Sequence, residues 1–377
     1  MSYGIGFYGC GFIGKVHLYG YKNLSLFYEQ PALNSKLVGV CTSKDKTAVR
    51  AKKQFGFEFS TTNYQELLDN EEIDIVHCVT PNYLHHDFVI DAIKAGKHIY
   101  CEKPLALNLK EAKNIKKIAE QENYQKKFQI THQYRYFPAT LKAKSLIENG
   151  FLGKVFGFRA QYLHSGYINE DRPMSWRLEY KKSGTGALGD LGSHVLDLMY
   201  HLLGPFQKVS AIQKTFINER PETKNSKEKT RVKVDDITTA MVHLENGAVG
   251  SVEAWRLATG SEDELRFEIH GSKGGLRFNL MKPNWLEVYD NTESEPFEGE
   301  KGWKKVSTIQ RFPEPAAFPG SKCPIGWMRA HVECLHSFLT AIKKDKMTAP
   351  SLEDGVYIQK LLDKIQKAAA NERFIEV

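Results

Sequence analysis

The sequence predicts an α/β protein with two domains: an N-terminal doubly wound parallel sheet and a C-terminal α/β domain with a large, mostly antiparallel open sheet. The length of 377 residues indicates two or three domains of about 150 residues each. Over residues 1–130, short β-rich runs alternate with helical patterns, which is typical of a parallel sheet with crossover helices. Beyond residue 150 the strand-like segments become longer. We therefore predict domains at 1–130 and 131–377.

The composition is that of an ordinary globular protein, with 41% hydrophobic and 26% charged residues. No apolar run approaches the roughly 18 residues of a membrane helix, and the glycines that begin at Gly4 leave no room for a cleavable leader. We therefore expect a cytoplasmic protein without a membrane partner. The net charge of +7 is spread along the chain, since residues 1–130 hold 17 basic and 14 acidic side chains, and we expect no nucleic-acid partner.

The six cysteines form no C-x-x-C pair, and four of them lie in or beside apolar strand-like runs. This pattern disfavours both a zinc cluster and a disulfide scaffold. We expect buried thiols in a reducing compartment and no metal site. The cysteines are Cys10, Cys41, Cys78, Cys101, Cys323 and Cys334.

Local signals mark helix starts and turns. Asn63 and Asn108 each precede a Glu by three residues, as in a capping box. The turns at 245–247 and 271–274 predict hairpins, while the charged stretches Glu219–Lys233 and Asp290–Lys305 predict surface loops. The predicted strands are Ile5–Tyr8, Lys36–Cys41, Ile73–Val79, His98–Cys101, Phe128–His132, Val155–Leu163, Lys208–Phe216, Ile237–Leu244, Ala248–Trp255, Glu264–His270 and Gly275–Phe278.

A glycine-rich turn, Gly9-Cys10-Gly11-Phe12-Ile13-Gly14, follows the first predicted strand and opens a helix. Gly9 permits a tight turn, Gly11 lets a pyrophosphate approach the amides at the helix N-terminus, and Gly14 permits close packing of helix on strand. This context predicts a dinucleotide-binding domain of the Rossmann type, with Phe12 and Ile13 beside the cofactor.

The second predicted strand ends at Cys41, near the expected position of the adenosine ribose. NAD-specific enzymes often place a carboxylate there, whereas this chain has Thr42-Ser43-Lys44. Hydroxyl groups and an ammonium group can bind a 2′-phosphate. The predicted cofactor is therefore NADP or NAD, with NADP favoured.

Two further strands end in polar segments, at the edge where open α/β sheets bind ligands. One segment is Thr80-Pro81-Asn82-Tyr83-Leu84-His85 and the other is Glu102-Lys103-Pro104. Pro104 restricts the backbone of Lys103 and makes the loop rigid. Because Lys103 would lie beside the nicotinamide, we expect it to donate or accept a proton.

A third cluster lies in the glycine-rich segment 184–194 and the helix that follows it. Asp190 and His194 are one helical turn apart on a single face. The carboxylate can bind substrate hydroxyls, and the imidazole suits proton transfer near neutral pH. The same spacing suits a metal, but no third ligand is evident. Taken alone, the cluster fits a solvated polar helix face better.

Together, these motifs in this order resemble the Gfo/Idh/MocA family of oxidoreductases. Further similarity lies in Arg135-Tyr136-Phe137-Pro138, in Trp176-Arg177 and in residues 245–250. The resemblance covers nearly the whole chain. It implies a Rossmann domain and a second domain whose sheet forms the interface of a homodimer or homotetramer. It also implies a C-terminal helix, here about 354–371, that can pack against the first domain.

The resemblance also implies roles for individual residues. Lys103, Asp190 and His194 fall on the catalytic Lys, Asp and His of the family, with the proton assigned to His in some members and to Lys in others. Candidate substrate contacts, for which simple packing is the alternative, are Tyr162, His164, Trp176 and Arg177. The residues expected near the cofactor are Thr80, Pro81, Asn82, His85, Glu102, Lys103 and Arg135.

Two features depart from the family pattern. An insertion around residues 25–34 lengthens the first crossover and can alter the rim of the cleft. Thr185 interrupts the usual glycine triplet, but Gly184 and Gly186 remain, so the chemistry should be unaffected.

These expectations describe an NAD(P)-dependent oxidoreductase that transfers hydride between nicotinamide and a secondary alcohol or ketone of a sugar, sugar derivative or cyclitol. Two alternatives stay open. One is a glycosidase or lyase that oxidises its sugar transiently with bound NAD, which would turn over a glycoside without net cofactor reduction. The other is a catalytically silent sugar sensor, which would bind a partner without any redox change.

Overall fold

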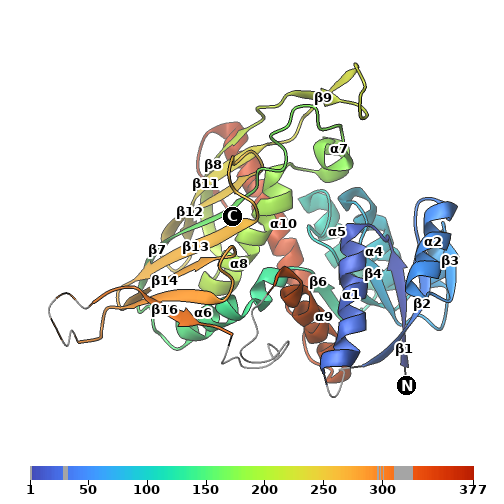
Figure 1. Ribbon diagram of the computed structural model, residues 1–377, viewed down its shortest axis with the longest axis horizontal. Helices are drawn as coiled ribbons and strands as arrows, with labels where there is room; N and C mark the ends of the chain where they lie inside the picture. The colour runs from blue at the N-terminus through green and yellow to red at the C-terminus, as the bar shows by residue number, and fades with distance from the viewer. Residues whose placement is uncertain (1, 29–32, 295–296, 298, 300, 310–325) are drawn as a thin grey trace. The chain divides into compact units, whose positions relative to one another are not determined.

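The computed structural model describes residues 2–28, 33–294, 297, 299, 301–309 and 326–377 (Figure 1). Their contacts divide the chain into two units, the first of residues 1–133 and 327–359 and the second of residues 134–326 and 360–377. The segment 327–359 was expected in the second domain, but its contacts place it in the first unit. Cys323 and part of the predicted insertion lie outside the described residues.

The first unit contains a six-stranded sheet in the order β3-β2-β1-β4-β5-β6, and every neighbouring pair is parallel. The strand order reverses direction at β1, between β2 and β4, which confirms the predicted doubly wound Rossmann sheet. The sequence analysis did not predict β3. The strands are β1 (Ser2–Tyr8), β2 (Asn34–Cys41), β3 (Phe59–Thr61), β4 (Ile75–Cys78), β5 (His98–Cys101) and β6 (Phe128–Ile130).

One of the two predicted capping boxes is confirmed. The Asn108 side chain accepts a hydrogen bond from the Glu111 amide (3.0 Å) at the start of α5. The prediction at Asn63 is wrong by one residue, because the N-cap of α3 is Tyr64; the Gln65 amide donates to Asn63 Oδ1 (3.1 Å). The helices of this unit are α1 (Phe12–Phe27), α2 (Asp45–Phe55), α3 (Gln65–Leu68), the 3-10 helix η1 (Asn82–Leu84), α4 (His85–Lys94), α5 (Leu109–Gln121) and α9 (Trp327–Lys343).

Helix α9 belongs to the first unit because its apolar face packs there. Phe338 is completely buried, with its ring 5.1 Å from that of Tyr100 on β5. The Gln129 side chain on β6 donates to the Cys334 carbonyl (2.9 Å). The 20-residue helix α10 (Leu352–Asn371) contributes its first turns to this unit and the remainder to the second.

The second unit contains a nine-stranded sheet in the order β16-β15-β14-β13-β7-β12-β11-β8-β17. Within this sheet, as far as the structure describes it, only the β7–β12 pair is parallel, so the predicted large, mostly antiparallel sheet is confirmed. Both predicted hairpins, β11–β12 and β13–β14, are present. The strands are β7 (Val155–Leu163), β8 (Phe206–Lys214), β11 (Ile237–Leu244), β12 (Val249–Trp255), β13 (Glu264–Gly271), β14 (Gly274–Asn279), β15 (Trp285–Asp290), β16 (Lys304–Ser307) and β17 (Ile375–Glu376).

The two predicted surface loops need correction. Glu219–Lys233 contains a two-stranded ribbon, β9 (Glu219–Pro221) with β10 (Lys229–Arg231). Within it, the buried Arg220 guanidinium donates to the carbonyls of Asn169 (2.7 Å) and Tyr167 (2.6 Å). Part of the second stretch pairs as β16 with β15. The strands in both stretches were missed because charged residues were taken as a sign of surface loops. Long charged side chains can bury their stems or place their head groups against backbone oxygens.

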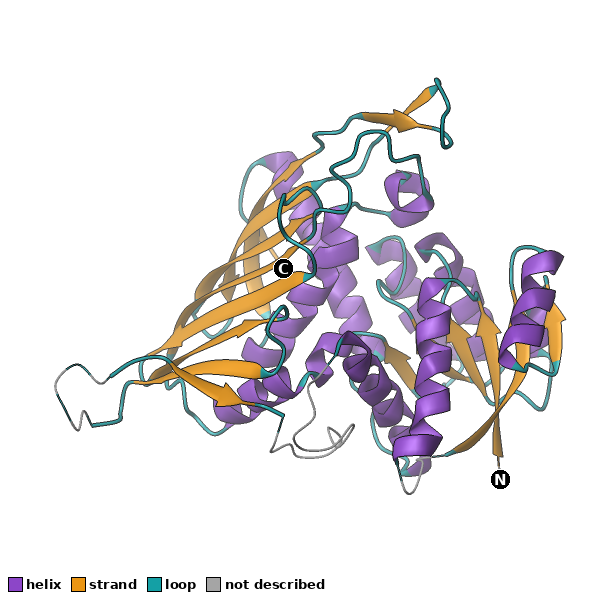
Figure 2. Cartoon of the chain, viewed as in Figure 1, coloured by secondary structure: helices purple, strands orange, loops and turns teal. Residues whose placement is uncertain are grey.

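Helices cover one face of the second sheet (Figure 2). Helix α8 packs on β7 and β12, and α6 packs on β14 and β15. On the other face, Ile212 and Met241 are 74% and 63% exposed. The helical segments of this unit are the 3-10 helix η2 (Gln133–Tyr136) at its start, α6 (Pro138–Glu148), the 3-10 helix η3 (Trp176–Leu178), α7 (Tyr180–Ser183), the π-helical turn η4 (Leu188–Gly192) and α8 (Ser193–Leu203).

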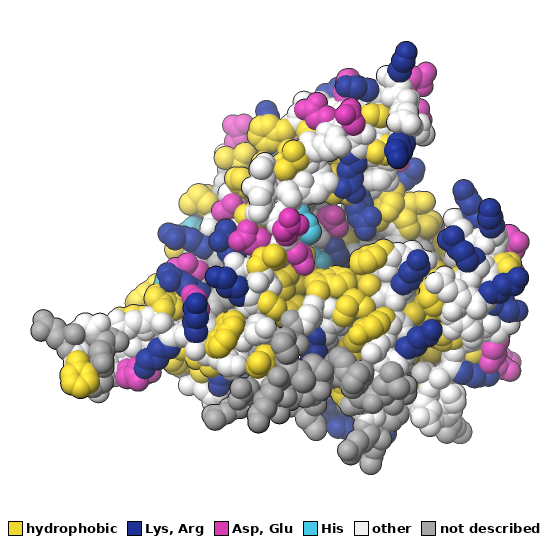
Figure 3. All heavy atoms as spheres, viewed as in Figure 1, with side chains coloured by type: hydrophobic (Ala, Val, Ile, Leu, Met, Phe, Trp, Pro, Cys, Tyr) yellow, Lys and Arg dark blue, Asp and Glu magenta, His cyan; other side chains and the backbone are white. Residues whose placement is uncertain are grey.

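The surface agrees with the spread of charge in the sequence. Figure 3 shows basic and acidic side chains scattered over the visible face of both units. Within the described part of the chain, no helix combines the length and the apolar character needed to span a membrane.

Truncation of Phe338 tests the packing of α9. Phe338→Ala removes a fully buried ring and should lower the free energy of unfolding by about 3 to 5 kcal/mol. Met347→Ala is the control, because Met347 is 88% exposed just beyond α9. Urea unfolding measures both. Equal stabilities for the two variants would show that α9 does not pack in this unit as described.

Candidate active site

The candidate residues fall on both units, and we define the first half-site as those in the first unit. Its glycine turn leaves β1 with Gly9 at a φ of +101°, where a side chain would also place a Cβ 2.6 Å from the Val79 carbonyl oxygen. Gly11 is the N-cap of α1, and a Cβ there would meet no atom within 4 Å. The space beside Gly11 is therefore open, which fits the close approach of a dinucleotide phosphate to this turn. Phe12 and Ile13 begin α1, followed by Gly14.

The end of β2 lies where the sequence predicted it, at Cys41. Thr42 Oγ1 donates to the Lys44 carbonyl (3.0 Å), and Lys44 is the N-cap residue of α2. Ser43 and Lys44 are exposed. The turn therefore presents an ammonium group and a hydroxyl to solvent, and no carboxylate stands among its three residues.

His85 joins the two polar loops of the first half-site. Its ring is completely buried, with Nδ1 3.0 Å from the Pro104 carbonyl oxygen and Nε2 3.0 Å from that of Thr80. Pro81 and the buried Asn82 lie between Thr80 and His85 in the sequence, at the start of η1. His85 thus holds the loop after β4 against the loop after β5, and a direct contact with the cofactor stays a prediction.

Glu102 and Lys103 have opposite surroundings although they are neighbours. The Glu102 carboxylate is buried beside His17 on α1, with Oε1 3.1 Å from His17 Nε2. Although burial raises its pKa, the hydrogen bond from His17 and the other groups around the carboxylate outweigh burial and lower it to about 2. The Lys103 amide donates to Glu102 Oε2 (3.3 Å), and Lys103 itself is half-buried.

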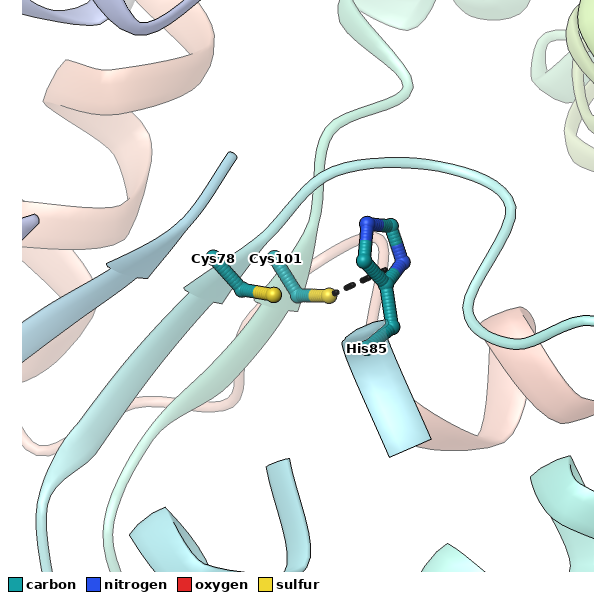
Figure 4. Close-up of side chains that lie close together, drawn as sticks. All are labelled: Cys78, His85 and Cys101. Carbon is teal, nitrogen blue, oxygen red and sulfur yellow. Dashed lines mark hydrogen bonds between the residues drawn. The ribbon is translucent and has the colours of Figure 1, made fainter. Parts of the chain in front are cut away.

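Cys78, His85 and Cys101 form a buried cluster that the cysteine spacing did not reveal (Figure 4). One ligand-type atom from each lies within 4.8 Å of the others, and Cys78 and Cys101 are register partners on β4 and β5. Both His85 nitrogens already lie 3.0 Å from a carbonyl oxygen, so the ring nitrogens are engaged with the backbone. The cluster is therefore better explained as core packing at the strand ends than as a site for an ion.

The second half-site is built on the segment that leads into α8. Residues Leu188–Gly192 form a π-helical turn, so regular α-helical spacing begins only at Ser193. π-Turns of this kind are frequent at functional sites. The sequence analysis assumed one continuous α-helix, and this assumption is wrong for Asp190.

Asp235 holds this segment in place. Its carboxylate accepts hydrogen bonds from the amides of Gly186 (2.7 Å) and Leu188 (2.8 Å) and from the Thr238 hydroxyl (2.9 Å). A Cβ at Gly186 would lie only 1.9 Å from the Asp235 carbonyl oxygen, so this position requires glycine. Thr185, which interrupts the glycine triplet, does not disturb this contact.

Asp190 lies beside two candidate substrate residues. Arg177 Nε is 3.7 Å from Asp190 Oδ2, and the Arg177 guanidinium lies 4.4 Å from the centre of the Trp176 ring. The side chains of Arg177 and Asp190 are partly exposed. The three side chains can therefore contact a hydroxylated ligand directly.

His194 lies among aromatic rings. Its ring centre is 4.8 Å from that of Tyr134 and 5.9 Å from that of Tyr162, both edge-on. The Tyr162 hydroxyl donates to Asp263 Oδ1 (2.6 Å), which is also 3.1 Å from His164 Nε2. Burial raises the pKa of Tyr162 well above its usual value. Tyr162 thus packs beside His194 with its hydroxyl already engaged.

Arg135 is paired with a carboxylate in its own unit. Its guanidinium is buried and donates twice to the Asp197 carboxylate on α8, with Nε 2.8 Å from Oδ2 and NH2 2.5 Å from Oδ1. A buried charge pair of this kind is costly to break. Arg135 therefore holds α8 in place, and its contact with a cofactor stays a prediction.

Sequence reasoning missed His17, Asp235 and Asp263. His17 follows Gly14 by three residues on the apolar face of α1, and a histidine there was a usable signal. Asp235 and Asp263 lie far along the chain from the residues that they bind, and no local pattern marks them.

Comparison with known proteins identifies the class. Residues 3–132 match the family described as "Oxidoreductase family, NAD-binding Rossmann fold", and residues 140–277 match "GFO/IDH/MocA C-terminal domain". The chain therefore belongs to the Gfo/Idh/MocA family, as the motifs indicated, and is an oxidoreductase with an NAD-binding Rossmann domain.

Individual relatives agree over the full length. Levoglucosan dehydrogenase of Pseudarthrobacter phenanthrenivorans is 34% identical, with 99% of this chain and 97% of that protein covered. Glucose-6-phosphate 3-dehydrogenase of Bacillus subtilis is 25% identical over 99% of this chain and 98% of its own. The structure of levoglucosan dehydrogenase in complex with NADH and levoglucosan superposes with a TM-score of 0.93 at 33% identity, covering 100% of each chain.

Asp235→Asn tests how the second half-site is held. The amide group replaces one acceptor oxygen and leaves at least one buried N–H donor without a partner, so the free energy of unfolding should fall by about 1 to 3 kcal/mol. We expect kcat to fall while dinucleotide affinity, which depends on the first unit, is retained. Asp171→Asn is the control on an exposed turn. If denaturant unfolding and kcat match in the two variants, Asp235 does not hold the segment.

Proposed function

We propose that the protein catalyses the reversible, NAD(P)-dependent oxidation of a secondary alcohol on a sugar or sugar derivative. The observation that carries this proposal is the pair of held turns, one presenting Lys103 and the other presenting Asp190 and His194. Proton-handling groups on rigid turns serve catalysis, whereas a silent sensor has no need of them. The relatives named as dehydrogenases of levoglucosan and of glucose 6-phosphate support the same activity.

The chain's own residues would handle the proton and the hydroxyl groups. A bound nicotinamide supplies the hydride acceptor or donor at its C4 atom. Loss of hydride makes the alcohol proton acidic, and His194 or Lys103 would accept it, a contribution of about 10² to 10⁴ in rate. Asp190 would accept a hydrogen bond from a neighbouring sugar hydroxyl and orient the ring.

The walls of the substrate pocket would come from the second half-site. We assign Arg177 to ligand contact because it lies beside Asp190, and Trp176 because its ring lies under the Arg177 guanidinium. Tyr162 and His164 would shape the pocket through the Asp263 carboxylate that both engage. Levoglucosan and L-sorbose, found in complexes of the relative, are therefore suitable first probes beside aldoses, sugar phosphates, cyclitols and glycosides.

For the cofactor, we propose that NADP is preferred over NAD. The exposed Lys44 and Ser43 at the end of β2 support binding of a 2′-phosphate. The complexes of the relative contain NADH, so both dinucleotides belong in every assay. Thr80, Pro81 and Asn82 would lie beside the cofactor at the end of β4.

We also propose that copies of the chain associate through the large sheet. Ile212 and Met241 project from the face opposite α8, and such exposed apolar side chains on a broad sheet support an interface. A homodimer or homotetramer would cover them.

Lys103→Ala tests the catalytic assignment. It should reduce sugar-dependent reduction of the dinucleotide by at least about 10²-fold, because a positioned acid or base is lost. Dinucleotide affinity, measured by fluorescence titration, should stay close to that of the wild type. Lys110→Ala, at an exposed lysine on α5, is the matched control. Full turnover in Lys103→Ala would refute the role of this lysine.

Lys44→Glu tests the cofactor preference. A carboxylate at this position repels a 2′-phosphate, so kcat/KM should fall for NADP and hold or rise for NAD. Lys46→Glu changes an exposed charge two residues further along and should leave the NADP to NAD ratio unaltered. The assignment fails if Lys44→Glu also leaves that ratio as it was.

A further inference from the structure

We propose that His17, supported by His77 and Tyr21, is a positioning residue that orients the Glu102 carboxylate and thereby fixes the turn carrying Lys103. The inference deepens the proposed function, on which the role of Lys103 rests. All of these residues belong to the first unit.

The contacts form one continuous buried chain. His17 Nε2 lies 3.1 Å from Glu102 Oε1, and His17 Nδ1 lies 3.0 Å from His77 Nδ1. His77 Nε2 lies 2.8 Å from the Tyr21 hydroxyl. Tyr21 and His17 are four residues apart on α1 and so share a helix face. The chain links α1, β4 and the end of β5.

Hydrogen-bond chemistry indicates which group donates and which accepts at each contact of this network. An ionised Glu102 accepts only, so His17 Nε2 must carry a proton that it donates to the carboxylate. With Nε2 as the donor, His17 Nδ1 can accept from His77 Nδ1–H, and His77 Nε2 can accept from the Tyr21 hydroxyl. Every contact is satisfied, and successive hydrogen bonds polarise one another toward the carboxylate.

The surroundings keep this arrangement dry and rigid. His17 and His77 are 3% and 0% exposed, and the His77 ring stacks on Phe7 at 4.4 Å. Burial lowers the pKa of His77 and raises that of Tyr21, so both stay neutral. Among the described residues, the other titratable groups that face this network include Tyr100 and Cys101 on β5 and His331 on α9.

The hydrogen-bond network ends at the backbone of Lys103. Glu102 Oε2 accepts from the Lys103 amide (3.3 Å), and the Pro104 carbonyl oxygen is 3.0 Å from His85 Nδ1. The Glu102–Lys103–Pro104 turn is thus held on both sides of Lys103 by buried histidines. Because proton transfer needs the reacting groups within hydrogen-bond reach, loss of one support should reduce turnover more than cofactor binding.

Two variants at His17 test the proposal, with a control elsewhere on the first unit. His17→Phe removes both ring nitrogens, whereas His17→Gln keeps an N–H that can reach Glu102. The control is His86→Gln, at a partly exposed histidine on α4. We expect His17→Phe to lower kcat about 100-fold, the usual effect of a displacement of about 1 Å at a reacting group. The dissociation constant of the dinucleotide should change less than about threefold, because the turn, not the phosphate site, is disturbed.

Rescue and pH dependence separate positioning from simple packing. His17→Gln should recover at least about a tenth of the wild-type kcat, since a donor to the carboxylate is restored. In His17→Phe, the acidic limb of the kcat profile should move to higher pH, because the unpartnered Glu102 takes up a proton more easily. Equal kcat in His17→Phe and His86→Gln would overturn the proposal, and so would a loss that His17→Gln does not reduce.

A measurement on the wild-type protein covers the case in which His17→Phe does not fold. Nitrogen-15 spectra of labelled histidines at pH 7 should show a proton on His17 Nε2 and on His77 Nδ1. A His17 Nε2 without a proton would overturn the proposal. The spectra need no turnover, so they separate a failure of the network from a failure of the proposed function. If the spectra show the expected protons but no sugar is oxidised, the proposed function fails and the network stands.

Discussion

Each half-site depends on a backbone turn whose main-chain amides donate hydrogen bonds to a buried carboxylate. Asp235 binds two amides of the segment leading to Asp190 and His194, and Glu102 binds the amide of Lys103. Buried carboxylates are stable only when their hydrogen bonds are complete, so each turn has little freedom once its acceptor is in place. Lys103 and Asp190 can then be partly exposed without being loosely placed.

The sequence was informative where the chemistry is local. The glycine turn at Gly9, the end of β2 at Cys41 and the cap at Asn108 each follow from neighbouring residues, and the structure has all three. Contacts between distant residues were not accessible: His17 and Glu102 are 85 residues apart, and Gly186 and Asp235 are 49 apart. Helix α9 shows the same limit, since contacts with the distant residues Tyr100 and Gln129 place it in the first unit.

The residues that hold the turns are different from the residues assigned to ligand contact. The groups that hold the turns, such as Glu102, His85 and Asp235, are buried and bind backbone atoms. Those assigned to the ligand, such as Trp176 and Arg177, lie at or near the surface of their unit. Substitutions among the latter can change the preferred sugar without disturbing the turns, which is consistent with relatives named for different sugars.

Hydride transfer to the nicotinamide is the central claim, and isotope transfer measures it most directly. A sugar that the enzyme turns over is supplied with deuterium on its carbinol carbons, and the dinucleotide and product are analysed by mass spectrometry. The account predicts one deuterium on the reduced dinucleotide for each ketone formed. Turnover that releases a hydrolysed or eliminated sugar with no net labelled dinucleotide would contradict it and indicate transient oxidation instead.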